Sequence, residues 1–296
     1  MKKINDTGNL RGFYEEVNIK KTTVTFLNDP VEDYYVESRL AGLSALVPRD
    51  PGAVLDAGGG SGSFFRLLCD RLDLDFRDIT VLDWAIAEIE RPDHAKLDPA
   101  KHFFIQGDVQ ALPVKSGAVD LIFNSEVIEH LPPERSVEML KDFLRVLRPG
   151  GHLLITTPNG TDYRRILQET ALSLLLFLGG KKIGSLDDRE YLKSRLFRKY
   201  LKFTGHSHVN VEAIEKKGLV GHTNVLPPSK IKAQLKEAGF TVTKTAFSIF
   251  IPLAHIPFVN RKRAYARSLF FAEKLIKTLR LGKFFLSCQM YLAVKG

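Results

Sequence analysis

The sequence predicts an α/β protein built on a doubly wound parallel sheet, and two observations carry that prediction. The first is segment 54–65, in which an apolar run ends at Asp56, a glycine-dense turn follows, and a helical pattern opens at Phe64. Strand, tight turn and helix N-terminus in this order form the nucleotide-cofactor turn of doubly wound sheets. The second is a series of further apolar runs alternating with helical segments, which is typical of βαβ units.

The spacing of the glycine-dense turn discriminates between cofactors. A dinucleotide fingerprint has the pattern G-x-G-x-x-G, and both registers fail because Ser63 and Phe65 occupy the third glycine position. Glycine permits positive φ and a close approach of the backbone to a ligand, and N–H groups at the following helix start face a negatively charged group. The pattern that is present is D-x-G-x-G-x-G, formed by Asp56, Gly58, Gly60 and Gly62.

Further strands follow this turn, and several of them end in polar residues. Asp83 closes the second predicted strand, Asp108 lies near the end of the third, and Ser125 closes the fourth. The carboxyl ends of parallel strands meet at one edge of a sheet, so we expect these side chains at one ligand site, with Asp83 holding ribose hydroxyls. The predicted segments are strands at 79–83, 102–109, 119–125 and 153–157, with a helix at 135–147 before the last of them.

The ordered acids, together with L-R-P-G-G-H-L-L-I-T-T-P-N at 147–159, resemble a known family. They are similar to the class I S-adenosylmethionine-dependent methyltransferases, specifically the methyltransferase type 11 group, which includes quinone-biosynthesis O-methyltransferases. The resemblance covers roughly 55–159 well and the remainder loosely. It implies a Rossmann-like seven-stranded sheet with five parallel strands and an antiparallel last pair, a helical cap, and S-adenosyl-L-methionine as cofactor.

The resemblance also implies cofactor roles for residues at the strand ends. Asp56 would orient the glycine turn and the amino acid part of the cofactor, and Asp108 with Val109 would take the adenine. Arg39 stands near the position where quinone-type relatives place an arginine against the cofactor carboxylate; the alternative is an ordinary surface arginine. Trp84 either stacks on adenine or packs in the fold. The remaining residues expected to bind the cofactor are Gly58, Gly60, Gly62, Asp83, Asn124 and Ser125.

Two groups of residues are candidates for a catalytic or metal-binding role. Glu126, Glu129 and His130 have the spacing E-x-x-E-H, with which some quinone-type relatives and RNA 3′-end 2′-O-methyltransferases hold a magnesium-type ion. Such an ion would polarise acceptor hydroxyls. The favoured alternative is that His130 orients the methionine part of the cofactor. His222 is the first choice for an active-site histidine, because segment 221–240 resembles the corresponding stretch of the relatives; the alternative is a loop histidine without a role.

The chain divides into four regions along its length. Residues 1–50 form an N-terminal helical cover with a helix at 31–46, and residues 51–160 form the cofactor-binding core. Residues 161–228 are expected to form a helical substrate cap, and residues 229–296 the C-terminal part of the core, with a basic insertion at 251–282. Expected elements of the last region are a helix at 230–237, a strand at 240–250, an amphipathic helix at 265–279 with Leu269, Phe270, Leu275 and Ile276 on its apolar side, and a strand at 284–294.

Composition indicates a cytoplasmic enzyme, with the oligomeric state left open. The chain has 296 residues, 44% of them hydrophobic, which suffices for a large core. Its two cysteines, Cys69 and Cys288, lie far apart in sequence, so they suggest neither a disulfide framework nor a zinc site and are expected to pack as small apolar residues. The first residues lack the apolar stretch of a signal peptide, and the longest apolar run, 171–178, is too short to span a bilayer.

The charge is distributed unevenly along the chain. Residues 1–160 carry 18 Lys and Arg against 25 Asp and Glu, a net charge of −7, whereas residues 161–296 carry 25 against 9, a net charge of +16. The basic half is either a solvated face or a surface that meets an anionic lipid-linked molecule, a membrane surface or RNA. We therefore expect methylation of a hydroxyl on a small or lipid-linked, anionic acceptor. The alternatives are a metal-assisted RNA 2′-O-methyltransferase and a cofactor-binding regulatory or partner protein without transfer activity.

Overall fold

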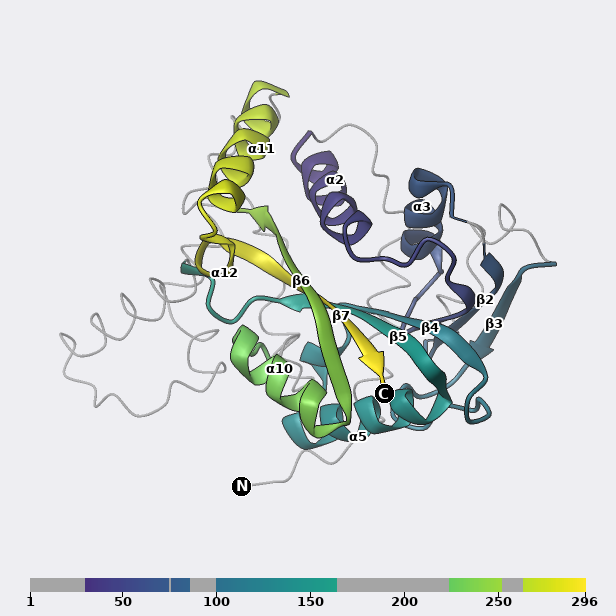
Figure 1. The fold of residues 1–296 in the computed structure, drawn as a ribbon. Helices are drawn as coiled ribbons and strands as arrows, with labels where there is room; N and C mark the ends of the chain where they lie inside the picture. The colour runs from purple at the N-terminus through teal and green to yellow at the C-terminus, as the bar shows by residue number, and fades with distance from the viewer. Residues whose placement is uncertain (1–29, 75, 86–99, 164–223, 252–262) are drawn as a thin grey trace, which may run out of the picture.

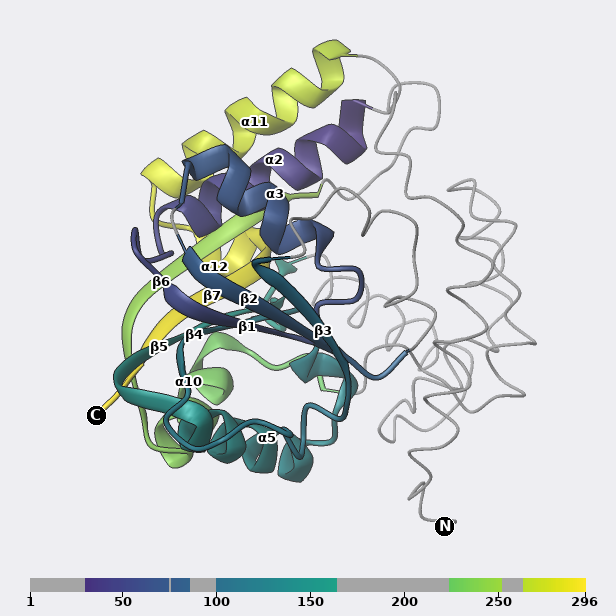
Figure 2. The ribbon, with the colours of Figure 1, turned by 90° about the vertical axis from the view of Figure 1, so that its right-hand side faces the viewer.

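The computed structural model describes residues 30–74, 76–85, 100–163, 224–251 and 263–296, and these form a seven-stranded mixed sheet with helices on both faces (Figures 1 and 2). The strand order is β3-β2-β1-β4-β5-β7-β6. The first five strands are parallel, whereas β7 runs antiparallel to both of its neighbours. The predicted fold class is confirmed. The strands are β1 (Gly52–Ala57), β2 (Phe76–Asp83), β3 (His102–Gln106), β4 (Val119–Ser125), β5 (Leu147–Pro158), β6 (Phe240–Phe250) and β7 (Leu286–Lys295).

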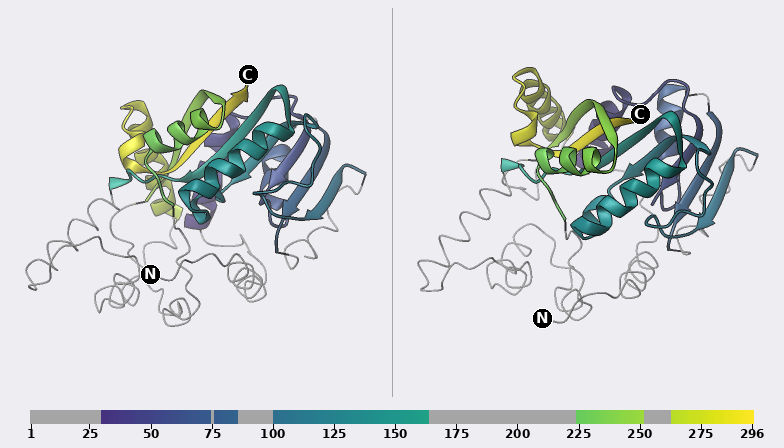
Figure 3. Two further views of the ribbon diagram at one scale, coloured as in Figure 1. Left: turned by 90° about the horizontal axis from the view of Figure 1, so that it is seen from below. Right: turned by 60° about the horizontal axis from the view of Figure 1, so that its bottom comes forward.

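Helices α5 and α10 cover one face of the sheet, and α2 and α3 cover the other (Figure 2). Figure 3 shows the first pair side by side across the strands. Helix α11 packs on α2 and on β6, and it lies on the outer side of α2 (Figure 2). The helices are α2 (Pro30–Ser44), α3 (Ser63–Leu72), the short 3₁₀ turn η2 (Ile128–His130), α5 (Pro133–Val146), α10 (Pro228–Glu237), α11 (Arg263–Thr278) and α12 (Gly282–Phe285).

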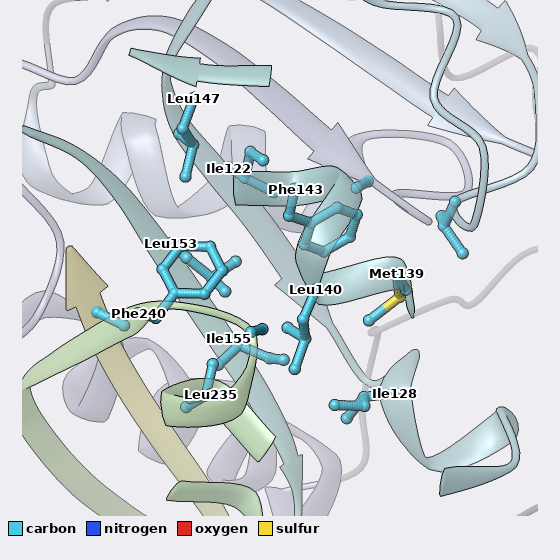
Figure 4. Close-up of a cluster of buried hydrophobic side chains, with 14 of the residues drawn as sticks. Ile122, Ile128, Met139, Leu140, Phe143, Leu147, Leu153, Ile155, Leu235 and Phe240 are labelled. Carbon is cyan, nitrogen blue, oxygen red and sulfur yellow. The ribbon is translucent and has the colours of Figure 1, made fainter. Parts of the chain in front are cut away.

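Each face of the sheet has its own apolar core. On one face Phe143 of α5 and Leu235 of α10 are fully buried against the strands (Figure 4). On the other face Leu43 of α2 and Phe65 of α3 are buried against the sheet. Both faces of the central strands are therefore covered, which explains why these strands read as continuous apolar runs rather than as alternating ones.

Several predicted boundaries are wrong, each for a local reason. The third strand ends at Gln106, because the Asp108 side chain accepts a hydrogen bond from the Gln110 N–H (2.8 Å) and so forms a turn. The fifth strand begins at Leu147, because that residue already pairs with Val119 of β4; the register then shifts, and regular pairing resumes at His152. The last strand begins after a short helix, α12, that takes up Phe284 and Phe285.

The predicted apolar side of the insertion helix is also wrong. Leu269 is buried, but Leu275 is 49% exposed and Phe270 is 42% exposed, so the four residues do not share one side of α11. Six residues correspond to about 240° around a helix of 3.6 residues per turn, which places Leu269 and Leu275 on different faces. Cys69 and Cys288 are buried free cysteines, as expected. None of the described helices combines the length and hydropathy needed to cross a bilayer.

A buried carboxylate joins α11 to α2. Glu273 is 4% exposed and accepts hydrogen bonds from the Tyr34 hydroxyl (2.6 Å) and the Ser38 hydroxyl (2.7 and 2.8 Å), both on α2. The same two hydroxyls accept hydrogen bonds from the backbone N–H groups of Phe250 (2.7 Å) and Ile249 (2.8 Å), at the end of β6. A partly exposed lysine, Lys277, completes the cluster at 2.6 Å. The N-terminal helix α2 is therefore joined to α11 through Glu273 and to the end of β6 through the same two hydroxyls.

We predict that Glu273→Ala lowers the free energy of unfolding by about 2–4 kcal/mol. The change removes the carboxylate that accepts from the buried Ser38 hydroxyl, and it leaves the Tyr34 hydroxyl, as a donor, with only its longer hydrogen bond, to the Phe250 carbonyl (3.2 Å). Urea unfolding followed by circular dichroism measures the change. Lys277→Ala serves as the control, and about 1 kcal/mol or less is expected because that lysine is exposed to solvent. Equal losses for the two variants would show that the carboxylate does not hold α11 in place.

Candidate active site at the carboxyl ends of the strands

The turn between β1 and α3 has the left-handed backbone conformation that its glycines predict. Gly58, Gly60 and Gly62 have φ values of +77°, +56° and +72°, a region in which residues with a Cβ are strained. A Cβ at Gly58 would lie 2.5 Å from the Val127 Cγ2 atom. The Gly58 N–H donates to the Leu82 carbonyl (2.7 Å), which fixes the turn against the end of β2.

Asp83 links the glycine turn to the second strand. Its carboxylate accepts hydrogen bonds from the N–H groups of Gly60 (2.8 Å) and Ala85 (2.8 Å). These bonds hold the side chain at the carboxyl end of β2, next to the turn. It remains partly exposed there, so a ligand can reach it.

A first cavity of about 150 Å³ opens beside this turn. The indole Nε1 atom of Trp84 is buried and has no hydrogen-bond partner among the described residues. The Trp84 side chain also borders this cavity, and its predicted contact with adenine stays a prediction. The cavity is lined by Gly58, Asp83, Trp84, Ala85, Val109, Glu126, Val127, His130 and Leu131.

Other residues expected at the cofactor lie behind this cavity wall. Asp56 is 3% exposed, and burial, with a smaller effect of the Asp83 charge, raises its pKa to about 8. A Cβ at Gly59 would lie 2.4 Å from the Asp56 carboxyl, so the turn folds directly over this acid. Asn124 is fully buried and donates to the Ala57 carbonyl (2.8 Å). Asp56 and Asn124 therefore support the turn from below, and Asp108 caps its own loop, as described above.

Arg39 of α2 reaches the ends of β4 and β5. Its guanidinium donates to the Ser125 hydroxyl (2.7 Å), lies 3.6 Å from a Glu126 carboxylate oxygen, and sits over the Phe64 ring at 4.5 Å from the centroid. Cation–π and charge-assisted contacts of this kind fix the orientation of an arginine. Arg39 is thus held at the ends of β4 and β5, and its predicted contact with the cofactor carboxylate stays a prediction.

Glu126 stands where two cavities meet. It follows β4 directly and has a φ of +57°, which is uncommon for a residue with a side chain. The Thr156 hydroxyl donates to Glu126 Oε1 (2.9 Å), and the Cys288 thiol lies 3.8 Å from the same atom. Unusual backbone conformations of this kind gather at functional sites.

The second cavity has a volume of about 350 Å³ and shares Glu126 with the first. Its walls come from α2, from the end of β5 and from the antiparallel pair β6 and β7, and they combine charged and apolar side chains. It is lined by Arg39, Glu126, Pro158, Asn159, Asp162, Val225, Ile249, Ile251, Ser287 and Cys288.

The three residues of the E-x-x-E-H sequence do not gather around one point. Glu129 is fully buried, and its carboxylate accepts a hydrogen bond from the Thr157 hydroxyl (3.0 Å). Burial, reinforced by the Glu126 charge, raises the pKa of Glu129. The His130 Nε2 atom lies 4.0 Å from a Glu129 oxygen and borders the first cavity, whereas Glu126 turns toward Arg39. Within the described residues, no group of three such side chains is arranged to hold a metal ion.

Comparison with known proteins identifies the family. The family model described as a methyltransferase domain matches residues 32–245, which is most of the chain. The chain belongs to the methyltransferase domain family. The class I S-adenosylmethionine-dependent relationship that the glycine turn and strand-ending acids predict is thus confirmed.

Individual relatives agree with this assignment. The chain is 32% identical over 122 residues to a malonyl-[acyl-carrier protein] O-methyltransferase of Serratia marcescens, covering 41% of this chain and 44% of the relative. It is 26% identical over 141 residues to the 2-methyl-6-phytyl-1,4-hydroquinone methyltransferase of Synechocystis, covering 48% and 42%. The chain therefore spans less than half the length of these relatives.

A solved structure shows the same fold. The S-adenosylmethionine-dependent methyltransferase from Mesorhizobium loti superimposes with a TM-score of 0.52 at 15% identity, covering 88% of this chain and all of that one.

The sequence did not identify several residues of this methyltransferase site. Phe64 beneath Arg39, Thr156 beside Glu126, and Cys288 and Ile249 in the second cavity come from four different elements. No local motif marks them, because they meet only after β6 and β7 add to the sheet. His222, the favoured active-site histidine, and most of the expected cap at 161–228 lie outside the described residues.

We predict that Gly58→Ala disrupts the glycine turn far more than Gly117→Ala does. Both positions have positive φ, +77° and +64°, so both variants incur the left-handed strain of about 1–2 kcal/mol. Only at Gly58 does the new Cβ also meet another side chain, whereas nothing lies within 4 Å of it at Gly117. Thermal unfolding and S-adenosylmethionine titration of both variants provide the comparison. Full cofactor affinity in Gly58→Ala would contradict the role of this turn.

Proposed function

We propose that this chain is an S-adenosylmethionine-dependent methyltransferase that methylates a hydroxyl of a small or lipid-linked acceptor. The observation that carries the proposal is the meeting of two cavities at Glu126, one beside the glycine turn and one between α2 and the antiparallel strands. Methyl transfer requires two bound molecules whose reacting atoms are held in contact. Two adjoining cavities in a chain of this family meet that requirement.

The first cavity and its surroundings fit the cofactor. Asp83 offers a carboxylate for ribose hydroxyls, and the Trp84 side chain lines the same cavity beside it. The Arg39 guanidinium lines the second cavity close to Ser125 and Glu126, where the two cavities meet, and we assign it to the carboxylate of the methionine part. When bound, the cofactor supplies an electrophilic methyl group. The protein's task is then to orient that group toward the acceptor.

The second cavity is suited to an amphipathic acceptor. Val225, Ile249 and Ile251 give it an apolar side, and Asn159 and Asp162 give it a polar side. The related enzymes carry names with acceptors of this mixed character, a malonyl group on an acyl-carrier protein in one case and a phytyl hydroquinone in another. We infer an acceptor with a polar reacting end and an apolar remainder.

Glu126 is our candidate for the general base. It borders both cavities, and its contacts with Thr156 and Cys288 involve Oε1. Arg39 beside it keeps the carboxylate in place. In this role Glu126 accepts the proton that an acceptor hydroxyl releases as its oxygen attacks the methyl group. Such assistance matters for a weakly acidic acceptor and not for a carboxylate, which is already ionised.

We predict that Glu126→Gln reduces the rate of methyl transfer by about 100-fold or more while the affinity for S-adenosylmethionine changes little. The assay follows transfer of a labelled methyl group to two probes, a hydroquinone and a malonyl thioester. Label is expected in the hydroquinone. Glu134→Gln, an exposed substitution in the first turn of α5, is the matched control and should retain full turnover.

Two results would contradict this assignment. Transfer to the malonyl thioester with no effect of Glu126→Gln would indicate a carboxylate acceptor that needs no base. Cofactor binding without transfer to any hydroxyl, amine or carboxylate probe would favour the regulatory alternative.

A further inference from the structure

The outer face of α11 carries an exposed apolar strip. Phe271 is 72% exposed, Leu275 is 49% exposed and Leu279 is 57% exposed. Residues four apart lie on one side of a helix, and the Leu279 N–H still donates to the Leu275 carbonyl (2.9 Å), so the spacing holds to the end of the strip. Large apolar side chains gathered on one exposed face mark interaction sites.

The opposite face of the same helix is firmly held. Ala266 and Leu269 are buried against Tyr34 of α2, and Phe270 packs edge-on against that ring with centroids 4.7 Å apart. Glu273 adds its buried hydrogen bonds to α2. The apolar strip therefore belongs to a helix whose inner face is already packed, and its three side chains are exposed. Figure 2 shows the helix itself on the outer side of α2.

The charges around the strip are of one sign. Arg267 and Lys274 are exposed, and they stand four residues before and three residues after Phe271, which makes both of them its neighbours on the helix surface. The only acidic residue of α11 is Glu273, and it is buried. Residues 161–296 as a whole have a net charge of +16. An apolar strip flanked by cations complements a surface that offers both phosphates and hydrocarbon.

We propose that the outer face of α11 docks on an anionic membrane surface. Phe271, Leu275 and Leu279 would enter the boundary between headgroups and acyl chains, while Arg267 and Lys274 would pair with lipid phosphates. RNA offers the phosphates but no partner for the aliphatic side chains of the strip, so a bilayer suits the face better. This inference stands independently of the proposed activity, because binding to lipid can be measured without any methyl acceptor.

The docking face is connected to the second cavity through one layer of side chains. Ile249 packs against the cluster that seats α11 and also lines that cavity. Membrane docking through α11 would therefore bring the proposed acceptor cavity close to the lipid surface. A lipid-linked acceptor could then enter the cavity without crossing bulk water.

Vesicle cosedimentation tests the inference on the full chain. With vesicles of phosphatidylcholine containing about one-third phosphatidylglycerol, the wild type should bind, and the variant F271S/L275S should bind at least about tenfold more weakly. The variant R267E/K274E should lose binding as well. Raising the salt concentration from about 0.1 M to about 1 M shortens the screening length from about 10 Å to about 3 Å and should release the wild type.

Matched controls separate docking from general effects of substitution. Phe103→Ser removes a phenylalanine that is 49% exposed on β3, at the opposite edge of the sheet. The variant K115E/K141E reverses two exposed charges away from α11. Both controls should bind like the wild type, and circular dichroism should show every variant folded.

The inference fails on any of four results. These are absence of binding by the folded wild type, binding that survives F271S/L275S, equal loss of binding in the controls, and binding to RNA in preference to vesicles. A wild type that dimerises without binding vesicles, and that becomes monomeric in F271S/L275S, would assign the strip to a second copy of the chain and would also overturn the proposal.

Discussion

The register of β1 between β2 and β4 is the constraint on which the site depends. Leu55 lies beside Thr80 on one side and Ile122 on the other, so the three strands end at the same level. The glycine turn, Asp83 and Ser125–Glu126 then emerge at one edge of the sheet. The hydrogen bond from the Gly60 N–H to Asp83 closes this arrangement, because it ties the first turn to the neighbouring strand. A slip of β1 by one residue would move each of its side chains to the opposite face of the sheet.

The reversed strand β7 adds the second half of the site. It pairs antiparallel with β5 and β6, so its start lies at the edge where the parallel strands end. Ser287 and Cys288 thereby reach the second cavity together with Ile249 of β6. The helix cover completes the enclosure, since Arg39 of α2 bridges to Ser125 and Glu126 while Glu273 holds α2 against α11. The glycine turn, which is typical of the family, and the second cavity, which is lined by distant parts of the chain, therefore lie at the same edge of the sheet.

The sequence predicted the elements whose signals are local. The glycine spacing predicted the turn between β1 and α3, and apolar runs ending in polar residues predicted which segments of the chain form parallel strands. Positions that depend on tertiary contacts could not be predicted. The face that α11 presents to solvent was assigned wrongly, because Leu269 and Leu275 are equally apolar and only packing against Tyr34 distinguishes them. Likewise, E-x-x-E-H spacing does not reveal that Glu129 turns inward to Thr157 while Glu126 turns toward Arg39.

The central claim is that the β1–α3 turn and Asp83 form a binding site for S-adenosylmethionine, and calorimetric titration of Asp83→Ala tests it most directly. Asp78→Ala on the same strand is the matched control, because Asp78 pairs with exposed Arg77 and borders neither cavity. We expect Asp83→Ala to weaken S-adenosylmethionine binding by about 1–3 kcal/mol, and Asp78→Ala to bind like the wild type. Unchanged affinity in Asp83→Ala, or a wild type that prefers NAD, would contradict the central claim.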